Sequence, residues 1–247
     1  MGAKLIQHGT HQVVFVLRPS SSNVAALREG GLKYRAVEED DIFDLPSSSC
    51  TVATTEELKS VGPVDVVILC VKTFQVASSI GDLASLVGPK TVIISTQNGV
   101  EAHNTIAGTY GQERTLCGVV RVLSYIESAD TTDGLVIRKN IPGSYHIGEI
   151  FPRVGVSPRV EQIVAAMVDA GIAAVAEPDI RTNAWEKLVR AACFFSCIAS
   201  NLRFYGMLLE WTGQHGLHRT CRWTSTRASQ DDCYCTTDAQ TASCCDG

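Results

Sequence analysis

Apolar runs alternate with helix-like stretches over the first two hundred residues of the chain. Val64–Val71 and Thr91–Ser95 are predominantly apolar runs rich in β-branched residues, and both predict buried strands. Val13–Leu17 is a third run of this kind and ends at Arg18. Between the first two runs, apolar positions from residue 74 to residue 86 fit one helical face. This alternation predicts a parallel β-sheet covered by helices.

The pattern changes after residue 115 to alternating stretches that predict antiparallel strands, with Asp-Gly and Pro-Gly pairs as turns. Apolar residues then recur at helical spacing in two later segments, and Asp179 is placed to cap the second helix. We therefore expect strands over 119–126, 134–138, 144–147 and 172–175, and helices over 160–168 and about 181–200.

Polar side chains follow the three strongest strands, at the point where each strand ends. Arg18 comes directly after the first strand, Lys72 and Gln75 follow the second, and Asn98 follows the third. Parallel sheets bind ligands at the carboxyl ends of their strands. We therefore expect these side chains to border one binding site.

Four separate motifs occur in a fixed order along the chain. They are Val66–Gln75 (VVILCVKTFQ), Thr96–Val100 (TQNGV), Gly148-Glu149 and Trp185–Leu188 (WEKL). Together they resemble the ketopantoate reductase family, whose members are NADPH-dependent 2-dehydropantoate 2-reductases. The resemblance covers roughly residues 1–200. It implies an α/β fold with a Rossmann-type NADP-binding domain over residues 1–177, followed by the start of an all-helical domain over residues 178–205.

The resemblance also assigns roles to individual residues. Arg18 matches the arginine that holds the 2′-phosphate of NADPH, where an NAD site would carry an acidic residue. Lys72 and Gln75 match a cofactor-facing element, and Asn98 matches the asparagine that contacts the nicotinamide ribose and the substrate. Lys187 matches the catalytic lysine, which attracts the ketoacid and donates a proton to its carbonyl oxygen.

Each of these residues also has a purely structural interpretation. Arg18 and Lys72 fit solvated loop positions, and Asn98-Gly99 fits an ordinary turn. Lys187 fits the polar face of a helix whose Trp185 and Leu188 lie in the core. Without the resemblance, the structural interpretation is favoured for Arg18 and Lys72.

The chain departs from the family pattern in three places. The glycine-rich phosphate-binding turn would fall before Met1, and Gly9 and Gly2 do not replace it, because they fit a helix–strand turn and a helix interior. The first, central strand would be missing too, which leaves its two neighbours with unpaired backbone groups. Ala191 and Phe195 occupy positions where the family usually carries asparagines. The family's helical domain also continues well beyond the end of the resemblance.

Two functions follow from these observations. The first is NADPH-dependent reduction of a small-molecule 2-ketoacid, nominally 2-dehydropantoate to pantoate in pantothenate biosynthesis. The second is a degenerate or truncated family member with little or no catalytic activity. A cysteine-based binding or redox-sensing domain is a third, less favoured interpretation. Since most of the helical domain is missing, the resemblance leaves a homodimer open.

Composition and charge narrow the choice of partners. The net charge of −5, the scattered Lys and Arg residues and the aromatic content of 6% argue against a nucleic-acid partner. No apolar run reaches the roughly 18–20 residues of a membrane span, so we expect no membrane partner. The default expectation is a cytoplasmic protein with reduced thiols.

Five of the ten cysteines fall in the last 27 residues of the chain. Cys233 and Cys235, with Cys244-Cys245, lack the spacing of a zinc site, so we expect no metal site and a disordered, Cys-rich tail over residues 206–247. After about Tyr205 the composition suggests a shifted reading frame or a retained intron. The cysteines before the tail are expected to serve as small core residues, namely Cys50, Cys70, Cys117, Cys193 and Cys197.

Overall fold

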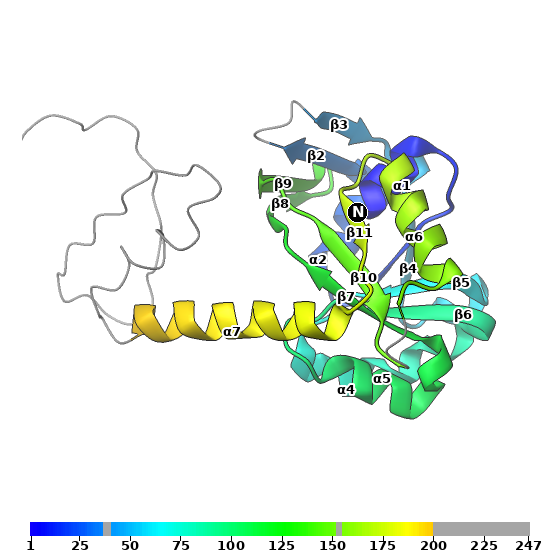
Figure 1. Ribbon diagram of the computed structural model, residues 1–247. Coiled ribbons are helices and arrows are strands. Elements are labelled where there is room, and N and C mark those ends of the chain that lie inside the picture. Colours follow the sequence, from blue (N-terminus) through cyan, green and yellow to red (C-terminus); the bar gives the residue numbers. More distant parts are fainter. Residues whose placement is uncertain (37–40, 152–154, 200–247) are drawn as a thin grey trace, which may run out of the picture. The chain divides into compact units, whose positions relative to one another are not determined.

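The computed structural model describes residues 1–36, 41–151 and 155–199 (Figure 1). Its largest sheet has five strands in the order β11-β10-β7-β6-β5. The strands β5, β6 and β7 are parallel, β10 is antiparallel to β7, and β11 is parallel to β10. These strands are β5 (Val64–Leu69), β6 (Val87–Ser95), β7 (Thr115–Val120), β10 (Tyr145–Glu149) and β11 (Ala174–Ala176).

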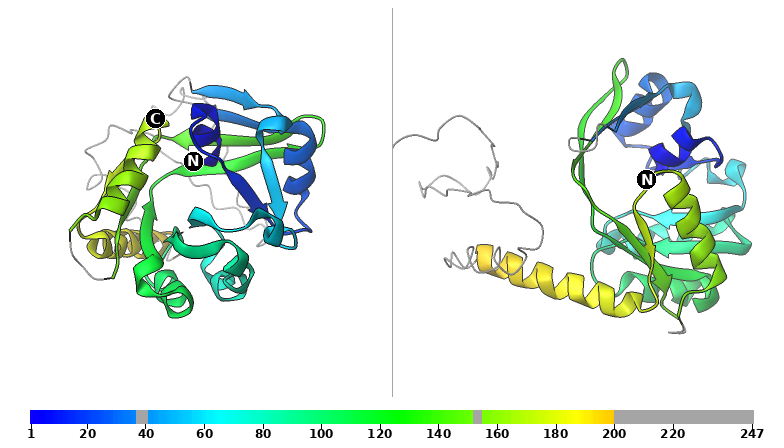
Figure 2. Two further views of the ribbon diagram at one scale, coloured as in Figure 1. Left: turned by 90° about the vertical axis from the view of Figure 1, so that its right-hand side faces the viewer. Right: turned by 45° about the horizontal axis from the view of Figure 1, so that its top comes forward.

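Two smaller sheets complete the strands. In the first, β1 (Val14–Leu17) pairs in parallel with β4 (Thr51–Thr54). The second sheet has the order β3-β2-β9-β8, and its β8–β9 hairpin rises along one side of the molecule (Figure 2). Its strands are β2 (Leu32–Ala36), β3 (Ile42–Leu45), β8 (Leu123–Asp130) and β9 (Gly134–Ile141).

The strands β1 and β5 are both sheet edges within the described residues. β1 pairs only with β4, and β5 pairs only with β6. The short helix α1 (Gly2–His8) contacts the cores on both sides: Ala3 belongs to the cluster against which Phe15 of β1 packs, and Leu5 packs against the same cluster as Ile68 of β5. The expected interruption of the parallel sheet between these two strands is therefore confirmed, and α1 provides the packing contact between them.

The remaining helices cover the sheets. The longest is α7 (Ile180–Ala199), whose first half packs on β7 and β10 and whose second half leads away from the sheets (Figure 1). The others are α2 (Ser22–Ala25), α3 (Leu58–Val61), α4 (Val76–Ser79), α5 (Ala102–Tyr110) and α6 (Pro158–Asp169). Helix α2 continues as a π-helical turn over Ala26–Gly30. Short 3-10 turns lie at Ser47–Ser49, Thr73–Gln75, Gly81–Ser85 and Gln112–Arg114.

Several predicted boundaries are confirmed by their caps. Asp179 caps α7, since its Oδ1 accepts a hydrogen bond from the backbone N–H of Thr182 at 3.1 Å. Gly9 ends α1 with a φ of 79°, a conformation that favours glycine. Gly2, by contrast, is the first residue of α1 and not an interior one.

Two predicted elements are wrong in part. The expected helix over residues 74–86 is broken into two 3-10 turns around the short helix α4, and Phe74 is 83% exposed instead of packing on the sheet. Val76, Ile80 and Leu83 are buried as expected. The expected strand over 119–126 is divided, because β7 ends at Val120 and β8 begins at Leu123 in another sheet.

The cysteines before the tail do not all serve the core. Cys50 and Cys117 are buried, as expected, whereas Cys70 and Cys193 are exposed, which corrects the prediction for these two. Cys70 follows directly after the edge strand β5, and Cys193 lies on the second half of α7, so neither is covered by a second layer. The side chain of Cys197 and the tail cysteines lie outside the described residues, as does the predicted tail over 206–247.

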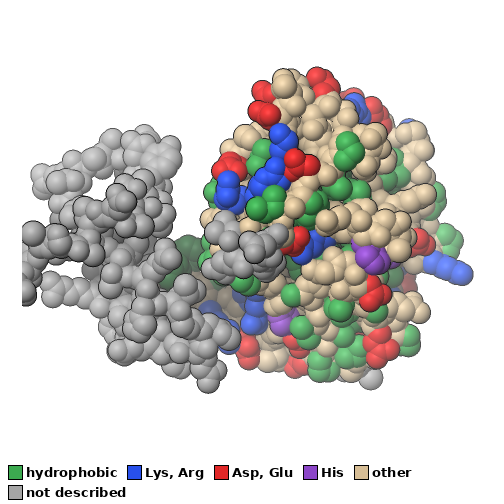
Figure 3. Space-filling model, turned by 90° about the horizontal axis from the view of Figure 1, so that it is seen from above, with side chains coloured by type: hydrophobic (Ala, Val, Ile, Leu, Met, Phe, Trp, Pro, Cys, Tyr) green, Lys and Arg blue, Asp and Glu red, His purple; other side chains and the backbone are tan. Residues whose placement is uncertain are grey.

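All described residues belong to one compact unit, α7 included. The predicted division at residue 177 therefore stays a prediction. In the described part of the chain, no helix is long and apolar enough to cross a membrane. On the face drawn in Figure 3, acidic and basic side chains lie beside one another and form no large patch of one sign, as the scattered charges in the sequence predict.

Candidate active site

Lys187 and Asn98 meet at the carboxyl edge of the parallel strands. Lys187 lies in the third turn of α7, and its Nζ donates hydrogen bonds to Asn98 Oδ1 at 2.7 Å and to the carbonyl of Val120 at 2.5 Å. Asn98 follows β6, and Val120 is the last residue of β7. The two residues that the resemblance assigns to substrate and catalysis are thus in direct contact.

Gln97 holds the loop that presents Asn98. Its side-chain amide donates to the carbonyls of Leu69 at 2.7 Å and Val71 at 3.0 Å, and Ser95 Oγ donates to its Oε1 at 2.9 Å. These bonds join the ends of β5 and β6. Gly99 then turns the chain with a φ of 97°. Gln97 is therefore a structural residue of the QNG motif.

Lys72 and Gln75 lie in the neighbouring loop after β5. The backbone N–H of Lys72 donates to Gln75 Oε1 at 3.2 Å, so the Gln75 side chain caps the 3-10 turn Thr73–Gln75. Thr73 Oγ1 donates to the carbonyl of Asn98 at 3.0 Å, which connects this loop to the next. The Lys72 side chain is exposed at the same edge.

Arg18 stands apart from the other predicted site residues. It follows β1, which belongs to the two-stranded sheet, and its side chain is exposed. Within residues 1–36, 41–151 and 155–199, no hydrogen bond or ion pair joins Arg18 to Lys72, Asn98 or Lys187. The structure therefore brings four of the five predicted residues to one edge and leaves Arg18 on a separate sheet.

Burial lowers the pKa of the Lys187 ammonium below its ordinary value of 10.5. The Arg121 guanidinium lowers this pKa further, and the Cys117 thiol partly offsets both effects. Burial raises the pKa of Cys117 itself to about 12, so this thiol stays protonated at neutral pH. A lysine with a lowered pKa releases its proton more readily than a solvated one, as a general acid requires.

Arg121 lies next to the Lys187 contact and is not among the residues that the sequence predicted for the site. One of its terminal nitrogens, Nη2, donates to Asn183 Oδ1 at 3.0 Å, and Asn183 lies one turn before Lys187 on α7. The Arg121 Nε is buried and has no hydrogen-bond partner among the described residues. Its position directly after the apolar run of β7 is the signal that could have found it, because Asn98 stands in a similar place after β6.

Gly148-Glu149 performs a structural task. Arg159 binds Glu149 with two hydrogen bonds, of 2.7 Å to Oε1 and 2.6 Å to Oε2, and Ser157 Oγ donates to Oε1 at 2.6 Å. Burial raises the pKa of the Glu149 carboxyl, but these hydrogen bonds outweigh burial, and the net shift is downward. The motif therefore anchors α6 to β10.

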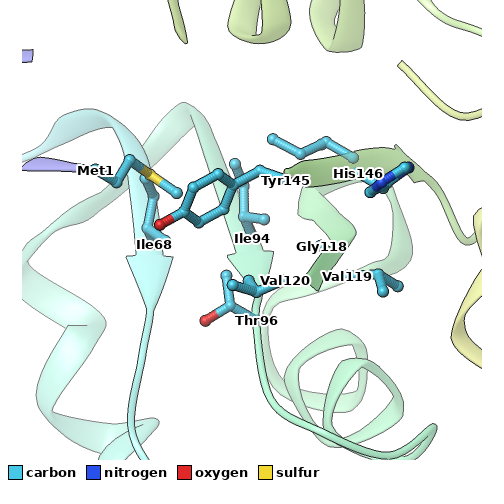
Figure 4. A pocket seen from close by; sticks show the side chains of 10 residues that line it. Met1, Ile68, Ile94, Thr96, Gly118, Val119, Val120, Tyr145 and His146 are labelled. Atoms are coloured by element: carbon cyan, nitrogen blue, oxygen red, sulfur yellow. The ribbon is translucent and has the colours of Figure 1, made fainter. Parts of the chain in front are cut away.

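A small pocket lies where the chain's first residue meets the sheet (Figure 4). Met1 and Tyr145 face one another across it, over Ile68 and Ile94, while the His146 ring points away. Burial raises the pKa of the Tyr145 hydroxyl to about 12. With this mostly apolar lining, the pocket is a feature of core packing.

The described residues fit a nicotinamide cofactor in part. Asn98, Lys72 and Lys187 offer polar groups at the carboxyl edge of parallel strands, which is where such folds bind a nicotinamide ring. Next to the edge strands β1 and β5, the described residues form no glycine-rich turn that would hold a pyrophosphate. The nicotinamide end of the site is therefore supported, and the phosphate end rests on Arg18 alone.

Parallel strands, covering helices and polar side chains gathered at the carboxyl edge define a Rossmann-type α/β protein. The family model described as ketopantoate reductase PanE/ApbA matches residues 1–151, and the chain belongs to this family. This match confirms the resemblance that the four sequence motifs indicate.

Individual relatives agree with the family match. The chain is 26% identical over 203 residues to a 2-dehydropantoate 2-reductase of Mesorhizobium japonicum, which covers 76% of this chain and 59% of the relative. A crystal structure of 2-dehydropantoate 2-reductase from Geobacter metallireducens GS-15 is similar with a TM-score of 0.64 and 29% identity, over 76% of this chain and 57% of that one.

A more distant neighbour shares the fold. The ternary structure of D-mandelate dehydrogenase with NADH and anilino(oxo)acetate is similar with a TM-score of 0.63 at 18% identity, over 78% of this chain and 56% of that chain. The predicted Rossmann-type fold is confirmed by these neighbours. The chain spans less than two thirds of the length of each of these three proteins.

Proposed function

We propose that this chain carries out the NADPH-dependent reduction of a 2-ketoacid, nominally 2-dehydropantoate to pantoate. The observation that carries the proposal is the contact between Lys187 Nζ and Asn98 Oδ1, at 2.7 Å. This contact places the Lys187 ammonium, whose pKa is lowered, at the carboxyl edge of the sheet, beside the loop that carries Lys72. The family membership of the chain agrees with this reaction.

The chain's own residues handle the proton of this reaction. Bound NADPH supplies a hydride to the carbonyl carbon of the substrate. Lys187 Nζ donates its proton to the carbonyl oxygen, which becomes the hydroxyl of the product, and the neutral amine regains a proton from solvent. Asn98 Oδ1 and the Val120 carbonyl fix the direction of the Lys187 ammonium, so this donor needs little reorganisation.

Arg18 supports NADPH over NADH in this proposal. A guanidinium after the β1 strand suits the doubly charged 2′-phosphate, whereas an NAD site would place a carboxylate there. No described residue forms an ion pair with Arg18, so its charge is available to a ligand. We keep the cytoplasm as the predicted location.

The test replaces Lys187 by methionine, which keeps the length of the side chain and removes its proton. We expect kcat/KM for 2-dehydropantoate with NADPH to fall by about 100-fold or more in Lys187→Met. The matched control is Lys59→Met, because Lys59 is exposed on α3. Steady-state kinetics on both variants measure the effect.

The pH profile gives a second measurement on the wild-type chain. Lys187 acts in its protonated form, so activity is present below its pKa and is lost as the pH rises through that pKa. Because burial lowers the pKa, the falling limb should lie below pH 10.5. A wild-type chain with no turnover would instead support the degenerate family member, and equal rates in wild type and Lys187→Met would remove Lys187 from the mechanism.

A further inference from the structure

Three basic side chains beside β7 and the first half of α7 have no acidic partner among the described residues. Lys187 donates to an amide oxygen and a carbonyl, Arg121 to the amide oxygen of Asn183, and Arg181 to the carbonyl of Ile150 at 3.4 Å. Over residues 1–36, 41–151 and 155–199, none of the three forms an ion pair with a carboxylate. Since a partly buried cation without a counter-ion is costly, this cluster is suited to an anionic ligand.

Arg121 is the member of the cluster that lies beside the reacting group. It follows Val120, whose carbonyl accepts a hydrogen bond from Lys187 Nζ, and its charge contributes to the lowered pKa of Lys187. Arg181 instead acts on His103 and Cys117, on the side of α5. Arg121 is therefore the arginine closest to the proposed proton donor.

A chain of four further side chains fixes the Arg121 guanidinium. Asn183 Oδ1 accepts from Arg121, and Asn183 Nδ2 donates to Glu177 Oε1 at 3.2 Å. The same carboxylate oxygen lies 2.6 Å from His146 Nδ1, and His146 Nε2 lies 2.7 Å from Ser144 Oγ. Both ends of the Asn183 amide are thus occupied, so this residue orients the guanidinium from one side.

The guanidinium has further N–H groups besides the one that Asn183 accepts. Nε is buried without a partner, and no described residue accepts a hydrogen bond from Nη1. An arginine presents pairs of parallel N–H groups that match the two oxygens of a carboxylate. Nη2 belongs to both pairs and keeps one N–H group besides the one that it donates to Asn183. A ligand carboxylate would accept from this group together with Nη1 or with the unsatisfied Nε.

We propose that Arg121 binds the carboxylate of the substrate and that Asn183 is its positioning residue. In a 2-ketoacid the carboxylate is adjacent to the carbonyl, and in this site the Arg121 guanidinium is adjacent to the Lys187 ammonium. One ligand can therefore engage both cations, the carboxylate on Arg121 and the carbonyl oxygen on Lys187. The carbonyl half of this assignment rests on the proposed function, and the carboxylate half does not.

The test measures binding and compares two probes that differ in one charge. Pantoate carries a free carboxylate, and its lactone has the same carbon skeleton without one. We expect isothermal titration of the wild-type chain to show tighter binding of pantoate than of the lactone. In Arg121→Gln, pantoate should bind roughly 10- to 100-fold more weakly, with lactone binding unchanged.

Two variants control for folding and for general loss of charge. Arg190→Gln removes an arginine that lies on α7, the helix of Asn183 and Lys187, and pairs with Glu186; it should leave pantoate binding unchanged. Arg121→Lys keeps the charge but loses the paired donors, so it should restore part of the affinity. If Arg121→Gln unfolds by circular dichroism, Arg121→Lys carries the comparison.

Asn183→Ala tests the positioning role. It leaves the Arg121 charge in place but removes its orienting acceptor, so KM for the ketoacid should rise while kcat changes little. Arg121→Gln has a separate signature: without the nearby positive charge, the pKa of Lys187 rises and the falling limb of the pH profile moves to higher pH. This shift reports the effect of the Arg121 charge on Lys187, while the comparison of pantoate with its lactone tests the carboxylate contact.

The outcomes separate this inference from the proposed function. Carboxylate-dependent binding that is lost in Arg121→Gln supports the inference even if the chain has no NADPH-dependent turnover. Equal binding of pantoate and lactone by the wild type, or equal pantoate binding by wild type and Arg121→Gln, overturns it. If pantoate binding is equal in wild type and Arg121→Gln while turnover still depends on Lys187, the inference fails and the proposed function stands.

Discussion

The five-stranded sheet and the β1–β4 pair both place a basic or amide side chain after a parallel strand, but they differ in how firmly that side chain is held. In the larger sheet, Ile94 of β6 is 1% exposed, and Gln97 and Thr73 join the loops after β5 and β6. In the pair, no residue of β1 is fully buried, and Val16 is 37% exposed. A strand-forming sequence therefore produces a strand in both places, while neighbours on both edges are needed to bury it and to fix the residue at its end.

The largest expected difference between the two regions is in core packing. Ile94→Ala should lower the free energy of unfolding by about 3 kcal/mol, because it leaves a cavity in the core that the sheet forms with α6. Val16→Ala should cost less than about 1 kcal/mol, because this side chain is partly exposed at a sheet edge. Urea unfolding at an unchanged m-value measures both. Equal losses would show that β1 is packed as firmly as β6.

The ion pair of the five-stranded sheet should contribute more to stability than the ion pair beside β4. Arg159→Ala leaves the carboxylate of Glu149, which is 8% exposed, without the two hydrogen bonds from Arg159, and should cost about 2 kcal/mol of stability. Arg28→Ala breaks the ion pair with Glu57 beside β4, where both side chains are exposed, and thermal melting should show a much smaller change.

The pH dependence of this difference has a definite sign. The folded-state pKa of Glu149 is lowered, so its contribution to stability is present above the unfolded pKa of about 4.3 and is lost as the pH falls through the folded value. Wild type and Arg159→Ala should therefore converge in stability between about pH 5 and pH 3. A gap that stays constant over this range would contradict the assignment.

The smallest expected effect concerns the ligand contact of the β1–β4 pair. Arg18→Ala should weaken NADPH binding by about tenfold and leave NADH binding unchanged, because only NADPH carries the 2′-phosphate. Titration of both cofactors measures this preference, with Arg28→Ala as the control arginine from the same region. If both cofactors lose the same affinity, Arg18 does not contact the 2′-phosphate.

The sequence predicted β1, β5 and β6 and the end-of-strand positions of Lys72 and Asn98, because apolar runs are a local signal. It did not predict β4 or most of β7, which is parallel to β6. It also did not predict β2, which pairs with β9 about a hundred residues later in the chain, or β3, which pairs with β2. The Phe74 prediction failed for a related reason: a period of apolar residues does not show that a helix is interrupted.

The site was predicted in a similar, uneven way. Lys187 and Asn98 were identified through motifs, and the structure adds their contact at 2.7 Å. Arg121 was missed because it lies inside a stretch that the alternating pattern assigned to one continuous strand. Its role depends on Asn183, a residue of the last helix, and such distant pairings leave no mark in local spacing.

Gly148 allows the start of α7 to approach β10 closely. A Cβ atom at this position would lie 2.5 Å from the carbonyl oxygen of Glu177 and 2.7 Å from the Cβ of Ile180, where α7 begins. The start of α7 therefore lies in close contact with the backbone of β10, and Lys187 lies two turns farther along this helix. A larger residue at position 148 would displace the start of α7 and, with it, Lys187. The position of the proposed proton donor therefore depends on a residue that has no side chain.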